Sequence, residues 1–146
     1  MKKVFSLALA LVVCILLTGC ETFKTYTYTV ENGDKVNIKI KTSGGYDLTT
    51  DVPFSIKKDD KTLSQGMFIN LTGYETYMSK IKNDKKSKVI KSDSTDNIEY
   101  TFYSYNDEEW NYIIKVKDTE TAILLGNPNS EKEAKECFEK IEISKK

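Results

Sequence analysis

The stretch that decides the fold is IEYTFYSYNDEEWNYIIKV, residues 98–116. Apolar and polar residues alternate on both sides of its acidic centre, a pattern typical of two half-buried strands joined by a turn. Pairing Ser104 with Trp110 places the large apolar residues on one face and sets Glu99 opposite Lys115, a favourable cross-strand pair. The apolar pairs in this register are Ile98–Val116, Tyr100–Ile114 and Phe102–Tyr112. We therefore expect an antiparallel hairpin with a five-residue loop, Tyr105–Glu109.

A second hairpin is predicted nearer the N-terminus, around Asn32-Gly33. Tyr26, Tyr28 and Val30 alternate with threonines before this dipeptide, and three further apolar residues alternate with polar ones after it. Asn-Gly between two alternating segments is a strong hairpin signal. We expect Val30 to pair with Val36, because this register gathers the apolar residues on one face and sets Glu31 opposite Lys35. A two-residue turn at Asn32-Gly33 would instead oppose Glu31 and Asp34 and mismatch the faces.

The remaining patterns complete an α+β fold. Thr72 with Glu75, and Ser130 with Glu133, have the spacing of a capping box, which predicts helices near 73–82 and 131–140. Further strands are expected at 46–49, 54–57, 63–71 and 121–125. We predict a single antiparallel sheet of about six strands packed with two helices, with Phe102, Tyr112, Ile114 and Phe138 in one core.

Two stretches give this layout a family likeness. They are Tyr46-Asp47-Leu48 through Val52-Pro53-Phe54-Ser55-Ile56, and Ala122-Ile123-Leu124-Leu125-Gly126 running into the last helix. Roughly the last hundred residues resemble, in their order of elements, the PsbP/Mog1-type α/β sandwich. That family consists mostly of adaptors and assembly factors, so the resemblance implies binding rather than catalysis.

The N-terminus has the features of a targeting signal. Lys2-Lys3 precede an apolar run, Val4–Leu17, which is too short to span a bilayer, and Leu17-Thr18-Gly19-Cys20 follows it. This arrangement resembles a bacterial lipoprotein signal, which implies removal of residues 1–19 and a diacylglycerol on Cys20. An ordinary secretory signal with Cys20 as a bystander is the alternative. Residues 20–24 then form the lipidated N-terminus and a short tether, in which Glu21–Lys24 span about 14 Å if extended. Residues 25–146 form one domain on the extracytoplasmic face of the cell membrane.

Composition excludes several function classes. The chain has 22 lysines and no arginine, and loss of Lys2 and Lys3 leaves 20 lysines against 22 acidic residues. A net charge near −2 argues against nucleic acid as a partner. With no histidine, histidine-dependent catalysis and histidine-ligated metals are excluded. We expect no enzyme activity, no metal and no cofactor.

Cys137 is expected to be structural. Ala134, Cys137, Phe138 and Ile141 have the spacing of one helix face, where a cysteine behaves as a small buried apolar residue. Cys137 is also the one cysteine of the chain that lies beyond the signal and its lipobox. No disulfide is predicted.

The candidate contact surface consists of three aromatic residues near the second hairpin loop. Tyr103 and Tyr105 fall off the apolar face of that hairpin, and Trp110 lies beside its loop. Exposed aromatic rings bind partners at low entropic cost. The alternative is that these rings pack under the second predicted helix, 131–140. Because the adjacent acidic residues, 107–109, would repel an anionic membrane surface, we expect an envelope protein or a neutral glycan as the partner.

Together these features predict a membrane-anchored, non-enzymatic binding or accessory lipoprotein. One alternative is a small cell-envelope enzyme that uses carboxylates, which cluster at Asp59-Asp60 and at residues 107–109. Another is a phage-exclusion or immunity lipoprotein.

Overall fold

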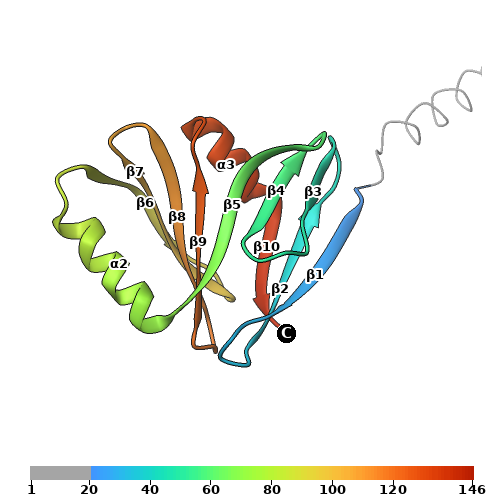
Figure 1. Ribbon diagram of the computed structural model, residues 1–146, viewed down its shortest axis with the longest axis horizontal. Helices are drawn as coiled ribbons and strands as arrows, with labels where there is room; N and C mark the ends of the chain where they lie inside the picture. The colour runs from blue at the N-terminus through green and yellow to red at the C-terminus, as the bar shows by residue number, and fades with distance from the viewer. Residues whose placement is uncertain (1–20) are drawn as a thin grey trace, which may run out of the picture.

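A computed structural model describes residues 21–146. It contains ten strands and two helices in that range (Figure 1). In chain order the elements are β1 (Phe23–Thr29), β2 (Lys35–Lys41), β3 (Tyr46–Leu48), β4 (Phe54–Lys58), β5 (Lys61–Asn70), α2 (Leu71–Asn83), β6 (Ser87–Ser94), β7 (Ile98–Tyr105), β8 (Glu109–Val116), β9 (Thr121–Asn127), α3 (Glu131–Glu139) and β10 (Ile141–Lys145).

The strands form two sheets, so the prediction of a single sheet of about six strands is wrong, although the α+β class is confirmed. A large sheet has the order β3-β4-β5-β9-β8-β7-β6, and a small sheet has the order β1-β2-β10. All neighbouring strands are antiparallel. The first hairpin leaves the large sheet because β10, which the sequence analysis did not anticipate, pairs with β2.

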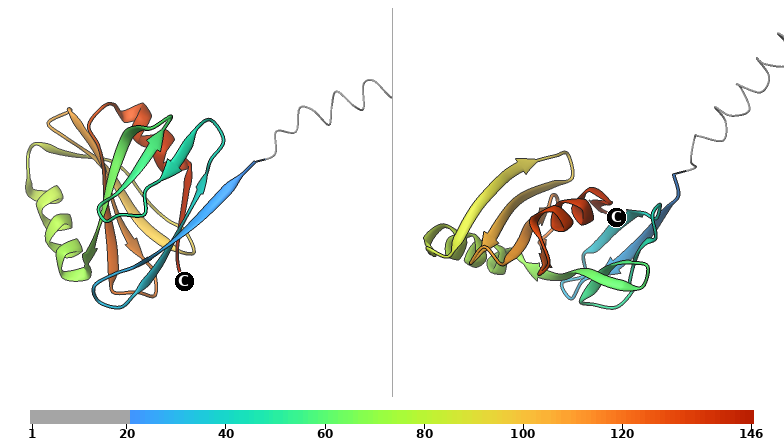
Figure 2. Two further views of the ribbon diagram at one scale, coloured as in Figure 1. Left: turned by 45° about the vertical axis from the view of Figure 1, so that its right-hand side comes forward. Right: turned by 90° about the horizontal axis from the view of Figure 1, so that it is seen from above.

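The helix α2 carries the chain across the large sheet. It connects β5 to β6, which lie on either side of the three strands β9, β8 and β7, and the chain then returns strand by strand through β7, β8 and β9. Figure 2 shows α2 and the small sheet at opposite sides of the molecule. The large sheet therefore has two differently covered faces.

We call these the core face and the α2 face. The core face packs against α3 and the small sheet, and its largest fully buried side chains include Phe54, Phe102 and Ile114. The α2 face forms a smaller cluster in which Tyr103 and Ile113 meet Ile81 of the helix. Successive side chains of a strand point to opposite faces, so the large sheet contributes to two cores instead of facing solvent on one side.

The register of the second hairpin is confirmed. Ser104 pairs with Trp110, Phe102 with Tyr112, and Glu99 with Lys115. The loop is shorter than expected, because Tyr105 also pairs with Glu109. Asn106 and Asp107 make the tight turn with φ of 56° and 57°, a conformation that these residue types tolerate better than most.

The register of the first hairpin is shifted by two residues from the prediction. Tyr28, rather than Val30, pairs with Val36. Val30 donates its N–H to the carbonyl of Asp34 at 2.9 Å, which leaves a three-residue loop ending at Gly33 with φ of 92°. Three-residue hairpin loops favour a left-handed residue at this position, and glycine adopts it without strain. A two-residue shift keeps every side chain on its predicted face.

The helices begin with side-chain caps, one of them unexpected. Ser130 caps α3 by accepting from the N–H of Glu133 at 3.1 Å, as predicted. The helix α2 starts at Leu71, two residues before the expected start at 73, because its cap is Asn70 rather than Thr72: the Asn70 side chain accepts from the N–H of Gly73 at 2.8 Å. Asparagine is as effective as serine at an N-cap, so the earlier start satisfies the same backbone donors.

Three stacked rings hold α3 to the core face. The ring of Tyr112 lies between Phe102, at 4.3 Å between centroids, and Phe138 of α3, at 4.1 Å. The predicted core of Phe102, Tyr112, Ile114 and Phe138 is confirmed, with Phe138 half-buried at its edge. Cys137 is fully buried in the same cluster, also as predicted, and burial raises the pKa of its thiol.

Replacing Phe138 by alanine is expected to lower the free energy of unfolding by about 3 kcal/mol, the low end of the range for large aromatic residues, since Phe138 is half-buried. Urea denaturation would measure the change. Glu139→Ala is the matched control, because this neighbouring side chain is exposed. Equal denaturation midpoints for Phe138→Ala and the control would contradict the stacking.

Candidate functional site

Tyr103 is buried, so the expectation that it is an exposed contact residue is wrong. It is 9% exposed and packs beneath α2 against Ile81 and Ile113. Burial raises the pKa of Tyr103 to about 12, with smaller contributions from Tyr77 and Glu109. The phenol therefore stays protonated at neutral pH and contributes mainly to packing.

Tyr105 and Trp110 lie on opposite faces of the large sheet. Tyr105 is half-buried and follows Tyr103 on the α2 face, where Lys86 places its ammonium 6.0 Å from the ring centroid. Trp110 pairs with Ser104 on the other face and packs against the main core. The three predicted contact residues therefore do not form one surface. The fourth predicted site residue, Cys20, lies outside the described residues.

A row of residues across the α2 face forms the floor of a groove instead. Asn111 of β8 pairs with Gly126 of β9, and Gly126 pairs on its other side with Gln65 of β5. Tyr103 extends the row beyond Asn111. Directly paired residues point to the same side of a sheet, so the two amide side chains flank the gap that the missing side chain of Gly126 leaves.

We call this groove the Asn111 groove. It comprises two adjoining hollows of about 330 Å³ and 370 Å³ that share Glu109 and Asn111. The first extends over Gly126 to Gln65, and the second extends under the C-terminal half of α2. The groove stays open because α2 does not cover β5, as the 45% exposure of Met67 on the same face shows.

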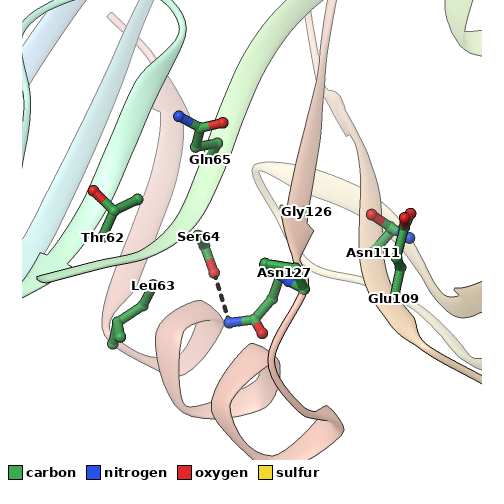
Figure 3. A pocket seen from close by; sticks show the side chains of 9 residues that line it. Thr62, Leu63, Ser64, Gln65, Glu109, Asn111, Gly126 and Asn127 are labelled. Atoms are coloured by element: carbon green, nitrogen blue, oxygen red, sulfur yellow. Dashed lines mark hydrogen bonds between the residues drawn. The ribbon is translucent and has the colours of Figure 1, made fainter.

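Figure 3 shows which polar groups of the first hollow are already satisfied. Asn127 donates to the hydroxyl of Ser64 at 3.1 Å, and it also donates to Glu133 at 3.1 Å, so these groups support the start of α3. Gln65, Glu109 and Asn111 make no hydrogen bond to one another. Their amide and carboxylate groups are available to a ligand.

Gly126 is an unusual residue for the interior of a central strand. A Cβ built there would lie 3.0 Å from Oδ1 of Asn111, which is tighter than ordinary contact. Glycine inside a strand often marks a place where another group approaches the backbone closely. Here it lets the Asn111 amide lie low over β9 and leaves the floor of the groove accessible.

The second hollow adds aromatic and charged groups. Tyr77 of α2 is 39% exposed and faces the groove together with Tyr105. Lys80 and Asp84 line the same hollow. The groove as a whole combines planar amides, tyrosine rings, one ammonium and two carboxylates, counting Glu109.

Two other hollows have a different character. One of about 610 Å³ lies over the stacked rings at Tyr100, Tyr112 and Phe138, with charged residues at its rim. The other, of about 770 Å³, lies between the first hairpin turn and the start of α2, and is lined by Val30, Phe68 and other residues. The first of these has stacked aromatic rings at its centre, whereas the paired row of the Asn111 groove carries two amide side chains.

The predicted carboxylate clusters do not make an evident catalytic pair. Asp59 and Asp60 form the β4–β5 turn. At the other cluster, a hydrogen bond from Lys88 holds the pKa of Asp107 below its usual value, whereas a general acid needs the opposite shift. Within residues 21–146 no three acidic or cysteine side chains are grouped so as to hold a metal ion.

Sequence reasoning missed Gln65, Asn111 and Gly126. Gly126 was the one hint of the groove in the sequence, since glycine interrupts the apolar run of β9, but a glycine there is equally consistent with the end of a strand.

No helix in the described range is long and apolar enough to cross a membrane. Comparison with protein-family models, with curated proteins and with solved structures finds no match to this chain.

Proposed function

We propose that this chain is a lipid-anchored, non-catalytic binding protein of the bacterial cell envelope that binds a neutral glycan in the Asn111 groove. The lipobox at Cys20 supports the anchor and its extracytoplasmic location. The observation that supports this ligand is the cross-strand row Asn111–Gly126–Gln65, which presents one amide side chain on each side of the gap at Gly126.

The chemistry of the groove matches that of a sugar. A neutral glycan offers hydroxyl groups in the plane of its ring and C–H groups above it. Amide side chains both donate and accept hydrogen bonds, which suits hydroxyls, and the carboxylate of Glu109 accepts them. The rings of Tyr77 and Tyr105 supply flat apolar surface with a polar edge.

The charges in the groove argue against an anionic polymer. Asp84 and Glu109 line the hollows, and Lys80 is the lysine among their lining residues. An anionic ligand would meet two carboxylates and one ammonium. The carboxylates would repel an anionic ligand but not a neutral one.

The test is a titration with the tetramer of N-acetylglucosamine, a neutral oligosaccharide, followed by NMR chemical-shift changes. Gln65→Ala is expected to weaken binding about tenfold, since one or two hydrogen bonds are lost. Gln65 is exposed, so the variant should fold normally. Asn97→Ala is the matched control, because Asn97 is an exposed amide that lines the 610 Å³ hollow instead.

Shifts at Gly126 and Asn111 that are weakened only in Gln65→Ala would support the proposal. Equal affinities of Gln65→Ala and Asn97→Ala would contradict the groove. If no neutral oligosaccharide binds but a photocrosslinker at Tyr105 captures an envelope protein, the protein partner replaces the glycan.

A further inference from the structure

The first residues of the described chain are fixed to the small sheet. Glu21 forms an ion pair with Lys41. Thr22 accepts the N–H of Thr42 at 2.9 Å through its carbonyl, and the two threonine hydroxyls hydrogen-bond at 2.6 Å. The strand β1 begins at Phe23, within the segment expected to be a tether. Cys20 is therefore adjacent in sequence to a residue that the fold already holds.

This attachment leaves almost no slack between the lipid and the domain. One residue of extended chain spans at most about 3.6 Å. If Cys20 carries the diacylglycerol, as the proposed function requires, the start of β1 must lie at the bilayer surface. The orientation of the whole domain then follows from which residues surround the start of β1.

Backbone hydrogen bonds identify those residues. Lys41, at the end of β2, donates its N–H to the carbonyl of Lys140 at 2.8 Å. Asp59, in the β4–β5 turn, donates to the carbonyl of Gly45 at 3.0 Å. We call this end of the molecule, residues 21–24, 41–46, 58–61 and 140, the tether end. Figure 1 shows the described chain starting beside this group of loops.

The opposite end carries the first hairpin turn and the C-terminus. Asp34 accepts from the hydroxyl of Thr121 at 2.7 Å and from the N–H of Glu120 at 2.9 Å. Lys146 donates its N–H to the carbonyl of Lys35 at 2.9 Å. Lys35 therefore lies at the far end of β2, which finishes at the tether end, and Glu120 lies next to Asp34 at the same far end.

The tether end presents groups suited to phospholipid headgroups. The ammonium groups of Lys58 and Lys140 lie 5.3 Å and 4.9 Å from the ring centroid of Tyr46, and neither forms an ion pair in the range that the structure describes. Phe23, the first residue of β1, is 43% exposed, and the ammonium group of Lys39 lies 4.3 Å from its ring centroid. The carboxylate of Asp59 lies against Gly45 rather than against these ammonium groups.

We propose that the tether end lies against the membrane, with Lys58 and Lys140 contacting anionic phospholipid headgroups. Juxtamembrane lysines are attracted to anionic lipid within about a Debye length of the surface, and aromatic rings favour the interface. The first hairpin turn and the C-terminus then point away from the membrane. This orientation rests on the proposed lipid anchor.

The experiment places a fluorophore on one end or the other of the lipidated protein. Ser43→Cys labels the tether end and Glu120→Cys labels the opposite end, while the fully buried Cys137 remains unlabelled. Each protein is reconstituted in vesicles of phosphatidylethanolamine and phosphatidylglycerol that carry a nitroxide on the headgroup. We expect loss of fluorescence at position 43 and none at position 120.

A separate variant tests the contacts of Lys58 and Lys140 with the headgroups. Replacing both Lys58 and Lys140 by glutamine should reduce the quenching at position 43, as should vesicles of neutral phosphatidylcholine. The matched control replaces Lys35 and Lys145, exposed lysines of the opposite end, and should leave quenching unchanged. Unchanged quenching in the Lys58 and Lys140 variant would overturn the headgroup contacts.

Failure of the orientation can be distinguished from failure of the anchor. If the protein floats with the vesicles but both positions are quenched equally, the orientation is wrong and the anchor stands. If the protein does not float with the vesicles at all, the lipid anchor is wrong and the orientation falls with it.

Discussion

Replacing Gly66 by alanine should lower the free energy of unfolding by about 3 kcal/mol, the upper part of the range for an overpacked core. A Cβ at this position would lie 2.1 Å from the Cζ atom of Phe54 and 2.6 Å from two more carbons of its ring. Phe54 is fully buried, and the rings of Tyr28 and Phe68 stand 5.4 Å and 5.7 Å from it. The ring therefore has no space into which it can move. Urea denaturation measures the loss.

A double-mutant cycle separates this clash from a general effect of alanine on the strand. Phe54→Leu removes ring atoms from the position that the new methyl group would occupy. The double variant Gly66→Ala, Phe54→Leu should therefore be more stable than the sum of the two single changes predicts. Strict additivity would show that the cost of Gly66→Ala does not come from the ring.

The second hairpin could be predicted from the sequence because two independent constraints agree on its register. The apolar pairs and the Glu99–Lys115 pair select the same alignment, and the structure has it. In the first hairpin the expected Glu31–Lys35 pair was misleading, because Lys35 pairs with Thr29 and Glu31 lies in the loop. The apolar pattern of this hairpin is satisfied equally by any two-residue shift. Its actual register depends on the backbone conformation of Gly33, which the alternation of side chains does not report.

Two strands were not anticipated, each for a specific reason. The strand β6 lies at the edge of the large sheet, and seven of its eight residues are exposed, so its sequence has no inward-facing apolar pattern. The strand β10 begins two residues after α3 ends. Its first residue, Ile141, continues the helical spacing of the residues before it and was assigned to the helix. Tertiary pairing with β2 decides its state instead.

The site prediction failed at Tyr103 because it assumed one core. A residue off the apolar face of a hairpin is exposed only if nothing covers the other face. Here α2 crosses that face, and Ile81 meets Tyr103 there. The alternative that the tyrosine packs under a helix is correct for Tyr103, but the helix is α2 and not the second helix, 131–140, that was expected. A crossover helix is set by the order of strands, which no local pattern in the sequence encodes.

The groove was beyond sequence reasoning for a related reason. Gln65, Asn111 and Gly126 come from three strands that are distant in the chain and become neighbours only through the order β5-β9-β8. Glu109 was recognised as part of an acidic loop, but it lies in β8, beside Asn111 in the groove. Polar residues on different strands reveal a site only when the pairing is known.

The largest functional effect is expected from Cys20→Ala, which should release the protein from the membrane. Each buried methylene of an acyl chain contributes about 0.8 kcal/mol, so two chains anchor stably, whereas a polypeptide without them has no such attachment. Cell fractionation, together with metabolic labelling by an alkynyl fatty acid, measures both the location and the lipid. The variant should lose the label and leave the membrane fraction.

Cys137→Ala is the matched control for that experiment. Cys137 is fully buried beneath α3, so it is inaccessible to an acyltransferase in the folded protein, and its loss should leave the label in place. Equal labelling of the wild type and Cys20→Ala would contradict the lipobox assignment. Loss of the label with retention in the membrane fraction would mean that a partner also holds the domain there. In that case the Gln65→Ala variant, combined with Cys20→Ala, would test whether the Asn111 groove provides that second attachment.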